Sequence, residues 1–303
     1  MLSARISFDS LKEKTEYINK CEKSFDFEIS DAVQKLLNHK KLKFIYVCGP
    51  SCSGKTTASD MLISKLSEKG RKVEIISVDD YYKNRETIIS ECQKKGVPVD
   101  FESLSAIDFP LFKRTLSDFS ISRPELEIPI FNFKNGIRCG TRTIKNTEET
   151  LILFEGIQTV YPEISALLNE YETEGVRIGV FDNVCVGDST LSMTDIRLVR
   201  RIVRDVFKRN TSPLETLKLW DSVRSNEIKN IEPYINKINI KINSFLGYEI
   251  SAMRNRAIKL LETIPEESPY KAISQRLYET IYPCEETHNS LIPKNSIIRE
   301  FLI

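Results

Sequence analysis

Short apolar runs alternate with helix-like segments through the middle of the chain. The apolar runs have the length of buried strands, and they lie at residues 44–48, 73–78, 151–154 and 176–181. Apolar residues at helical spacing predict helices over residues 57–69 and 106–116. Strands that alternate with helices predict an α/β fold, in which helices cover both faces of a parallel sheet.

The segment 127–143 departs from this alternation. It contains two strand-like runs on either side of a turn at Asn135-Gly136. An Asn-Gly pair between two such runs is typical of a tight turn between antiparallel strands, so we expect an inserted β-hairpin here.

The two ends of the chain also differ from the middle. Residues 1–40 are polar and rich in Lys and Glu, with a predicted helix from Ser30 to Asn38. The chain beyond Tyr248 has helical spacing and is interrupted by Pro265, Pro269, Pro283 and Pro293. We therefore expect an N-terminal extension, a core domain and a helical C-terminal extension packed on that core, at residues 1–40, 41–246 and 247–303.

The first apolar run leads directly into a glycine loop. Residues 49–56 read Gly-Pro-Ser-Cys-Ser-Gly-Lys-Thr and fit the pattern G-x-x-x-x-G-K-[ST], with a helix predicted immediately afterwards. Backbone N–H groups at a helix N-terminus bind anions, so this is the form of a nucleotide phosphate site. The alternative is a chance match in a turn, which the flanking strand and helix disfavour.

Each residue of this loop has an expected role. Lys55 can reach the β- and γ-phosphates, and the Thr56 hydroxyl can ligate Mg²⁺. The residues expected to bind ATP are Gly49, Ser51, Cys52, Ser53, Gly54, Lys55, Thr56 and Thr57.

Two carboxylates follow other predicted strands. The carboxyl ends of parallel strands face the ligand crevice, so Asp79 is expected near the transferred phosphate. Asp79 could accept a proton from an attacking hydroxyl, lie in the Mg²⁺ shell, or do both. The alternative is that Asp79 or Asp80 caps a helix. Glu155 ends the third apolar run and is expected to bind Mg²⁺ through water.

Arginines recur at helical spacing later in the chain. Four of them fall at i, i+3, i+4 and i+7 and share one helical stripe: Arg197, Arg200, Arg201 and Arg204. Such a stripe could be a solvated basic face or a nucleic-acid patch. Beside a phosphate-binding loop we favour a clamp on the transferring phosphoryl group, carried on a closing lid.

Composition excludes several other classes. The chain has 303 residues, of which 41% are hydrophobic and 29% are charged, with a net charge of +1. These values describe an ordinary globular protein, with no overall electrostatic field that would favour nucleic acid or a membrane over a small-molecule substrate. We see no apolar stretch of membrane-spanning length and no apolar leader, so we expect a cytoplasmic protein. Homo-oligomerisation remains open.

The cysteines point to reduced thiols. There are seven of them, an odd number, and none has the C-x-x-C spacing of a zinc or redox site.

These motifs, in this order, resemble the uridine kinase and phosphoribulokinase family of P-loop kinases. The resemblance spans roughly residues 42 to 245 and includes Ser77–Tyr82, which matches "S-x-D-D-x-Y", and Leu153–Ile157, which matches "L-F-E-G-I". It implies a P-loop NTPase fold of three layers, α/β/α, with a parallel central sheet, an inserted β-hairpin and an arginine-rich helical lid. ATP and Mg²⁺ are the implied cofactors.

The resemblance also implies roles for single residues. Asp79 is the implied base toward the sugar hydroxyl. Arg201, Arg204 and Arg209 are implied contacts of the phosphates or the substrate. The implied acceptor-binding residues are Tyr82, Glu102, Phe131 and Arg138.

The likeness is greatest to a subgroup of bacterial-type uridine kinase homologues. Its "F-N-F-K-x-G-x-R" hairpin matches Phe131–Arg138, and its "W-x-S-V-R" segment matches Trp220–Arg224. Its "N-S-x-x-x-Y-E" motif matches Asn243–Glu249, and its "I-P-x-x-S-I-x-R-E-F" motif matches Ile292–Phe301. The C-terminal half of the chain therefore shares the resemblance.

The chain departs from the well-studied members where they read the base. Gly136 stands where those members carry a histidine, and Thr211 and Leu219 stand where they carry an arginine and a glutamine. A hydrogen-bonding pocket that lacks its donors loses much of its selectivity.

The resemblance implies transfer of the γ-phosphate of ATP to a primary hydroxyl, with the 5′-OH of uridine or cytidine as leading acceptor. A phosphorylated sugar such as ribulose 5-phosphate is a second candidate acceptor. A non-catalytic nucleotide-binding regulatory protein is a third reading. A GTPase switch is disfavoured, because Asn236-Lys237-Ile238-Asn239 lacks the Asp of N-K-x-D.

Overall fold

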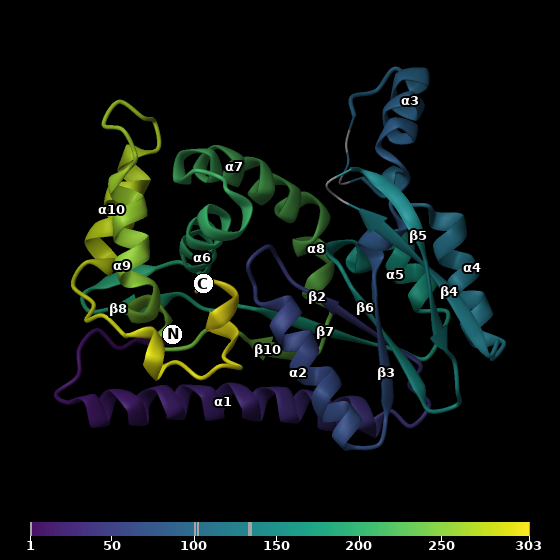
Figure 1. The fold of residues 1–303 in the computed structure, drawn as a ribbon, viewed down its shortest axis with the longest axis horizontal. Coiled ribbons are helices and arrows are strands. Elements are labelled where there is room, and N and C mark those ends of the chain that lie inside the picture. Colours follow the sequence, from purple (N-terminus) through teal and green to yellow (C-terminus); the bar gives the residue numbers. More distant parts are fainter. Residues whose placement is uncertain (1, 100, 102, 133–134, 303) are drawn as a thin grey trace. The chain divides into compact units, whose positions relative to one another are not determined.

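The computed structural model describes residues 2–99, 101, 103–132 and 135–302. The chain divides into two compact units (Figure 1). The first unit comprises Met1–Gln34, Gly49–Leu62 and Arg177–Ile303, and the second comprises Lys35–Cys48 and Ile63–Val176. Three elements contribute residues to both: α1 (Leu11–Asn38), α2 (Lys55–Glu68) and β7 (Thr173–Gly179).

The predicted parallel sheet is confirmed. Within the described residues, a five-stranded sheet has the order β10-β7-β2-β6-β3. The strands besides β7 are β2 (Phe44–Cys48), β3 (Lys72–Ser77), β6 (Thr150–Glu155) and β10 (Ile240–Asn243). Both β2 and β3 pair with β6 in parallel, with Ile45 opposite Leu153 and Ile76 opposite Phe154. Asp79 follows β3 and Glu155 ends β6, so the two residues lie at the same edge of the sheet.

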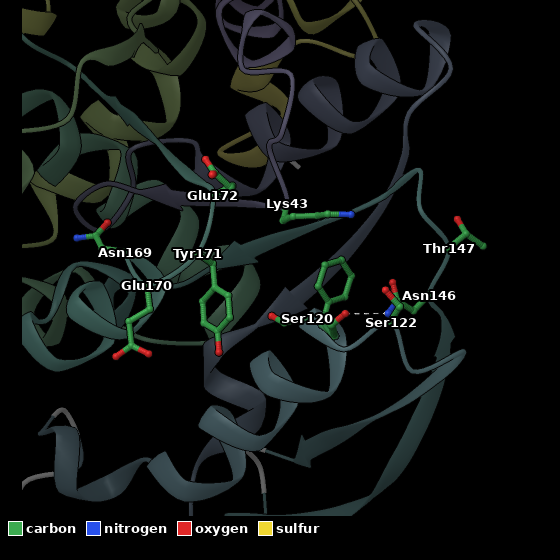
Figure 2. Close-up of a pocket in the computed structure, with 10 residues that line it drawn as sticks. Lys43, Ser120, Ser122, Asn146, Thr147, Asn169, Glu170, Tyr171 and Glu172 are labelled. Carbon is green, nitrogen blue, oxygen red and sulfur yellow. Dashed lines mark hydrogen bonds between the residues drawn. The ribbon is translucent and has the colours of Figure 1, made fainter.

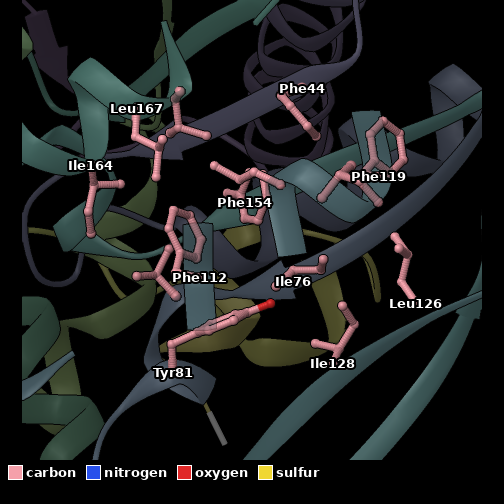
Figure 3. Packing of buried hydrophobic residues seen from close by; sticks show 14 of the residues in the cluster. Phe44, Ile76, Tyr81, Phe112, Phe119, Leu126, Ile128, Phe154, Ile164 and Leu167 are labelled. Atoms are coloured by element: carbon pink, nitrogen blue, oxygen red, sulfur yellow. The ribbon is translucent and has the colours of Figure 1, made fainter. Parts of the chain in front are cut away.

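The second unit has an aromatic core on one face of these strands (Figure 3). Phe44 of β2 lies 5.0 Å from Phe119, and Phe154 of β6 lies 5.3 Å from Phe112, measured between ring centroids. Phe112 and Phe119 belong to α4, which thus covers this face and holds β2 and β6 in place. The other elements of the unit are α3 (Arg85–Lys95), α4 (Phe109–Ser120), α5 (Pro162–Leu168) and the short helices η1 (Val78–Tyr81), η2 (Leu104–Ala106) and η3 (Ile157–Val160).

The predicted hairpin is also confirmed. Strands β4 (Glu125–Asn132) and β5 (Ile137–Lys145) pair antiparallel, and a bulge lies between Ile130 and Phe131. A bulge re-aims the side chains that follow it, here Phe131.

The first unit is mainly helical. Helix α6 packs against α7 and α9, and α9 packs against α10. These elements are α6 (Met193–Arg209), α7 (Pro213–Asn230), α8 (Glu232–Ile235), α9 (Glu249–Glu262), α10 (Lys271–Ile281), η4 (Asn289–Leu291) and η5 (Ile297–Glu300). In the described chain a small sheet has the order β1-β8-β9, formed by Leu2–Ala4, Val184–Val186 and Ser189–Leu191. No helix of the described residues is long and apolar enough to span a membrane.

Two predicted helix boundaries were wrong. The N-terminal helix begins at Leu11 instead of Ser30. Its first part was missed because its buried apolar residues, among them Ile18, Phe25 and Ile29, are widely spaced between Lys and Glu residues. The helix expected from Ala106 begins at Phe109, because the Asp108 carboxylate accepts a hydrogen bond from Leu111 N at 3.2 Å and caps it.

Candidate active site

The glycine loop lies between β2 and α2, as predicted, and two of its positions require glycine. A Cβ at Gly49 would lie 2.1 Å from the carbonyl oxygen of Ile178, and Gly54 has φ +84°. Ser53 is buried, and its Oγ has no hydrogen-bond partner among the described residues. An unsatisfied hydroxyl inside a tight glycine turn suits a phosphate oxygen as ligand.

Lys55 is folded back over this loop. Its Nζ donates to the carbonyl oxygens of Gly49 at 2.9 Å and Pro50 at 3.0 Å. The ammonium group is thus held at the loop by its own backbone. Thr56 is exposed at the start of α2, and Thr57 is half-buried.

Two arginines of α6 hold the loop from the other side. Arg197 Nη1 donates to Ser51 O, and Arg200 Nη1 donates to Cys52 O, both at 3.2 Å. Arg197 pairs with Glu227 and Arg200 pairs with Glu249, both at 2.7 Å. Because Arg197 is only 2% exposed and Arg200 is fully buried, these two side chains do not form a solvated basic face.

Glu227 is a loop contact that the sequence analysis missed. Its Oε1 accepts a hydrogen bond from Ser51 N at 3.0 Å, and its carboxylate also pairs with Arg224. Burial alone would raise the pKa of Glu227, but the hydrogen bonds and charges of Arg197 and Arg224 outweigh it and hold that pKa below its usual value. No spacing rule in the sequence links Glu227 to a loop so far upstream.

The other arginines of α6 gather around one carboxylate. Asp205 forms ion pairs with Arg201 at 3.2 Å, Arg204 at 2.7 Å and Arg209 at 3.6 Å. Burial and then the charge of Arg204 lower the pKa of Arg209, as expected where cations outnumber anions. Arg201 Nη1 also donates to Ser51 Oγ at 3.1 Å. Excess positive charge therefore lies beside the loop, where it suits a polyphosphate.

The C-terminal segment also reaches the loop. Ile297 is buried, and a Cβ at Gly54 would lie 2.3 Å from its Cδ1. The Arg200 guanidinium lies 5.0 Å from the centre of the Phe301 ring. The C-terminal residues are thus part of the packing around the loop.

In the second unit, Asp79 lies in η1, immediately after β3. Ser77 caps this turn, because its Oγ accepts a hydrogen bond from Asp79 N at 3.3 Å. The alternative that Asp79 or Asp80 is the cap is therefore wrong. Asp80 Oδ1 accepts a hydrogen bond from Phe131 N at 3.1 Å, which ties the hairpin to the end of β3.

The Asp79 carboxylate is held by Gln158, a residue that the sequence analysis also missed. Gln158 Nε2 donates to Asp79 Oδ1 at 2.7 Å and to the Tyr82 hydroxyl at 3.0 Å. Glu155 lies opposite Ser77 in the register of β6 and β3, so it lies at the same edge of the sheet as the turn that carries Asp79. The one available signal was the position of Gln158 shortly after the β6 strand end.

The candidate acceptor residues lie partly together. The rings of Tyr82 and Phe131 are 5.6 Å apart between centroids and tilted by 41°. Arg138 donates to Tyr82 O and pairs with Asp108, both at 3.2 Å, so its guanidinium holds the hairpin against the turn. Glu102 lies outside the described residues.

The backbone at Gly136 explains the missing histidine. Gly136 has φ +68°, and a Cβ there would lie 2.9 Å from the Cβ and the Nε of Arg85. A histidine at this position would be strained and would collide with Arg85. Thr211 lies in the turn after α6, following Asn210 in the left-handed conformation, and Leu219 is exposed on α7.

A cavity of about 470 Å³ opens elsewhere in the second unit (Figure 2). It is lined by Lys43, which precedes β2, by Thr147, which precedes β6, and by Tyr171. It therefore lies at the amino ends of these strands. Asp79 and Glu155 lie at the carboxyl ends, so this cavity is separate from them.

The structure thus forms two clusters. The first unit brings together the loop with Lys55, Arg201, Arg204 and Arg209, and the second brings together Asp79, Tyr82, Phe131 and Gln158. A parallel α/β sheet with a glycine loop of this form defines the P-loop class of nucleotide-binding proteins.

Comparisons with known proteins agree and are more specific. The model of the phosphoribulokinase / uridine kinase family matches residues 44–250, and the chain belongs to this family. It is a kinase of that family, and hence a phosphotransferase.

Among its relatives is a uridine kinase of Ureaplasma urealyticum serovar 10, which is 26% identical over 68% of this chain and 90% of its own length. Uridine-cytidine kinase C of Dictyostelium discoideum is 26% identical over 82% of this chain, which spans 50% of that protein. The solved structure of the YGR205w protein has a TM-score of 0.50 and 16% identity, and the match covers 67% of this chain and 86% of the other; it supports the fold.

Proposed function

We propose that this kinase transfers the γ-phosphate of ATP to a primary hydroxyl, and that the acceptor is the 5′-OH of uridine or cytidine. The observation that carries the proposal is the cluster at the carboxyl edge of β3 and β6. There the Asp79 carboxylate is held by Gln158, next to the aromatic pair of Tyr82 and Phe131. Uridine kinases among the relatives support the choice of acceptor.

The loop fits a triphosphate. The buried Ser53 hydroxyl lacks a partner among the described residues, and the close approach at Gly49 leaves room for backbone only. We propose that the loop amides and Lys55 bind the β- and γ-phosphates. Arg201, Arg204 and Arg209 would then stabilise the charge that spreads over the transferring group.

Oxygen ligands in each unit suit magnesium. Hydroxyl and carboxylate oxygens are the donors that Mg²⁺ prefers. In the first unit Thr56 would supply a hydroxyl beside the loop, and in the second Asp79 and Glu155 would supply carboxylates at the strand ends. When bound, the ion neutralises phosphate charge. Asp79 is proposed to accept the proton of the attacking hydroxyl. The hydroxyl oxygen then bonds to the γ-phosphorus, and the bond from that phosphorus to the oxygen bridging it to the β-phosphate breaks, which releases ADP.

Charge pairing disfavours a sugar phosphate as acceptor. A cavity of about 840 Å³ beside Arg138 is also lined by Lys83. Lys83 pairs with Glu91 at 2.8 Å and Arg138 pairs with Asp108 at 3.2 Å. The lining as a whole has three basic and three acidic side chains, so it has no excess positive charge that would favour a negatively charged acceptor over a neutral nucleoside.

A test is ADP release from MgATP with uridine, cytidine, ribulose 5-phosphate or no acceptor. We expect release with a pyrimidine nucleoside. Asp79→Asn should lower kcat by ~10²- to 10⁴-fold and leave ATP affinity within about threefold. Asp188→Asn, at an exposed turn, is the matched control. ATP binding without acceptor-dependent release would instead support the non-catalytic reading, and full activity of Asp79→Asn would remove Asp79 from the mechanism.

A further inference from the structure

We propose that Gln158 is a positioning residue for this reaction, fixing the Asp79 carboxylate and the Tyr82 hydroxyl relative to each other. The inference rests on the proposed function, because it assigns Asp79 the role of base. It concerns a residue that lies outside the glycine loop, the aspartate turn and the arginine helix.

The orientation of the Gln158 amide follows from its partners. An ionised carboxylate can only accept hydrogen bonds, so the group 2.7 Å from Asp79 Oδ1 must be the Nε2 donor. The same Nε2 donates to the Tyr82 oxygen at 3.0 Å, so the phenolic hydrogen points away from Gln158. One NH₂ group therefore fixes the directions of both side chains.

The three side chains come from two different strand ends. Asp79 lies in η1 and Tyr82 follows it, both after β3, whereas Gln158 lies in η3 after β6. Because β3 and β6 are neighbours in the sheet, the hydrogen bonds of Gln158 join the two turns across the edge. A carboxylate anchored in this way keeps one rotamer, which is what alignment with an incoming hydroxyl needs.

Packing alone does not explain a glutamine here. Gln158 is only 2% exposed, and its Oε1 has no hydrogen-bond partner among the described residues. A buried polar atom without a partner is destabilising, and an apolar side chain of similar size would avoid that cost. A Cβ at Gly156 would lie 2.8 Å from Oε1, so the backbone there leaves space for this amide.

The decisive variant is Gln158→Met, which keeps the length of the side chain and removes the donor. Hydrogen bonds to charged groups contribute about 1.5–3 kcal/mol, so kcat should fall by about 10- to 100-fold. The KM for ATP should stay within about twofold. The fall in kcat should remain when kcat is calculated per ATP-binding site, with the sites counted by calorimetry. A purely structural role would lower the number of sites and leave the kcat per site unchanged.

Gln158→Glu should also lower kcat, because an ionised carboxylate has no hydrogen to donate to Asp79. Gln93→Met, on the exposed face of α3, is the matched control and should behave as wild type. A kcat per ATP-binding site of Gln158→Met within about twofold of wild type would overturn the inference.

A second measurement needs no variant. In the wild-type protein the side-chain NH₂ of Gln158 should exchange with solvent far more slowly than that of Gln93, as followed by NMR. Equal exchange rates would contradict the geometry. If the wild-type enzyme phosphorylates no nucleoside, the proposed function fails, and the exchange rates still test the hydrogen bonds.

Discussion

At the scale of single residues, the glycine loop depends on backbone that no side chain can replace. Gly49→Ala would place a methyl group 2.1 Å from the carbonyl oxygen of Ile178, so the loop must move. We expect ATP affinity to fall by at least ~100-fold, as measured by calorimetry. Thr141→Ala, at an exposed position of β5, is the control and should bind ATP normally. Unchanged binding by Gly49→Ala would contradict the loop geometry.

Cys52 illustrates a second prediction at this scale. Burial raises the pKa of its thiol more than the nearby Arg204 and Arg201 lower it, so the thiolate is disfavoured. We expect iodoacetamide at neutral pH to modify the exposed Cys139 and to spare Cys52. Mass spectrometry of the labelled peptides measures this, and labelling of both at equal rates would contradict the burial.

Residues that carry a motif could be predicted from the sequence, and residues that act through one long-range contact could not. The spacing of Gly49, Gly54 and Lys55 indicated the loop directly. Gln158 and Glu227 each act through hydrogen bonds to a distant turn or loop. Gln158 follows a strand end, but that position does not identify its partners, and Glu227 has no local pattern at all.

At the scale of elements, the arginines of α6 divide into two groups. Arg197 and Arg200 hold loop carbonyls through buried ion pairs, while Arg201, Arg204 and Arg209 surround Asp205. The sequence predicted the helix and its stripe. It could not predict this division, because both groups share one spacing and differ only in the partners that other helices supply.

The buried pair of Arg200 and Glu249 gives a prediction for this element. Arg200→Met leaves the fully buried Glu249 carboxylate without its guanidinium, so the free energy of unfolding should fall by about 3–5 kcal/mol. The double variant Arg200→Met/Glu249→Leu removes both charges and should recover most of that loss. Its ATP affinity should stay weak, because Cys52 O has lost its donor.

Urea denaturation and ATP titration of both variants measure these effects. Arg254→Met is the matched control, because that side chain donates to Tyr282 O away from the loop. Recovery of ATP affinity together with stability in the double variant would show that Arg200 does not anchor the loop.

At the scale of the whole molecule, the sequence predicted the alternating α/β order, the parallel sheet and the hairpin, because apolar residues recur at different spacings in strands and in helices. The prediction was wrong where a helix has few apolar residues on its buried face. In α1 the first buried residues, Lys14 and Ile18, are surrounded by exposed charges, and their burial depends on packing against the distant C-terminal region, as in the contact of Lys14 with Glu286 O.

Stability should depend on pH through two buried carboxylates of the first unit. Burial alone would raise the pKa of Glu227 and that of Asp195, but both are lowered in the fold, because hydrogen bonds from arginine and serine partners and the arginine charges outweigh burial. A depressed folded pKa stabilises the protein above the unfolded values of 4.5 and 3.8, and this contribution is lost as pH falls through the folded pKa values.

Thermal unfolding measured from about pH 3 to about pH 7, which spans the titration of both carboxylates, measures this effect. We expect the Tm to fall steeply below the unfolded pKa of Glu227, and Glu227→Gln to show a lower Tm at neutral pH with a shallower acid decline. The exposed Glu148→Gln is the control and should follow wild type. An equally steep decline in Glu227→Gln would remove Glu227 as a source of the pH dependence.

The central claim is that Asp79 serves the transfer of the γ-phosphate of ATP to a nucleoside hydroxyl. Incubation of the enzyme with MgATP labelled in the γ-phosphate and with uridine tests it most directly, with the product identified by mass spectrometry and ³¹P NMR. We predict labelled uridine 5′-monophosphate from the wild-type protein and none above background from Asp79→Asn. Label that appears only as inorganic phosphate, or that reaches uridine equally well in the variant, would contradict the claim.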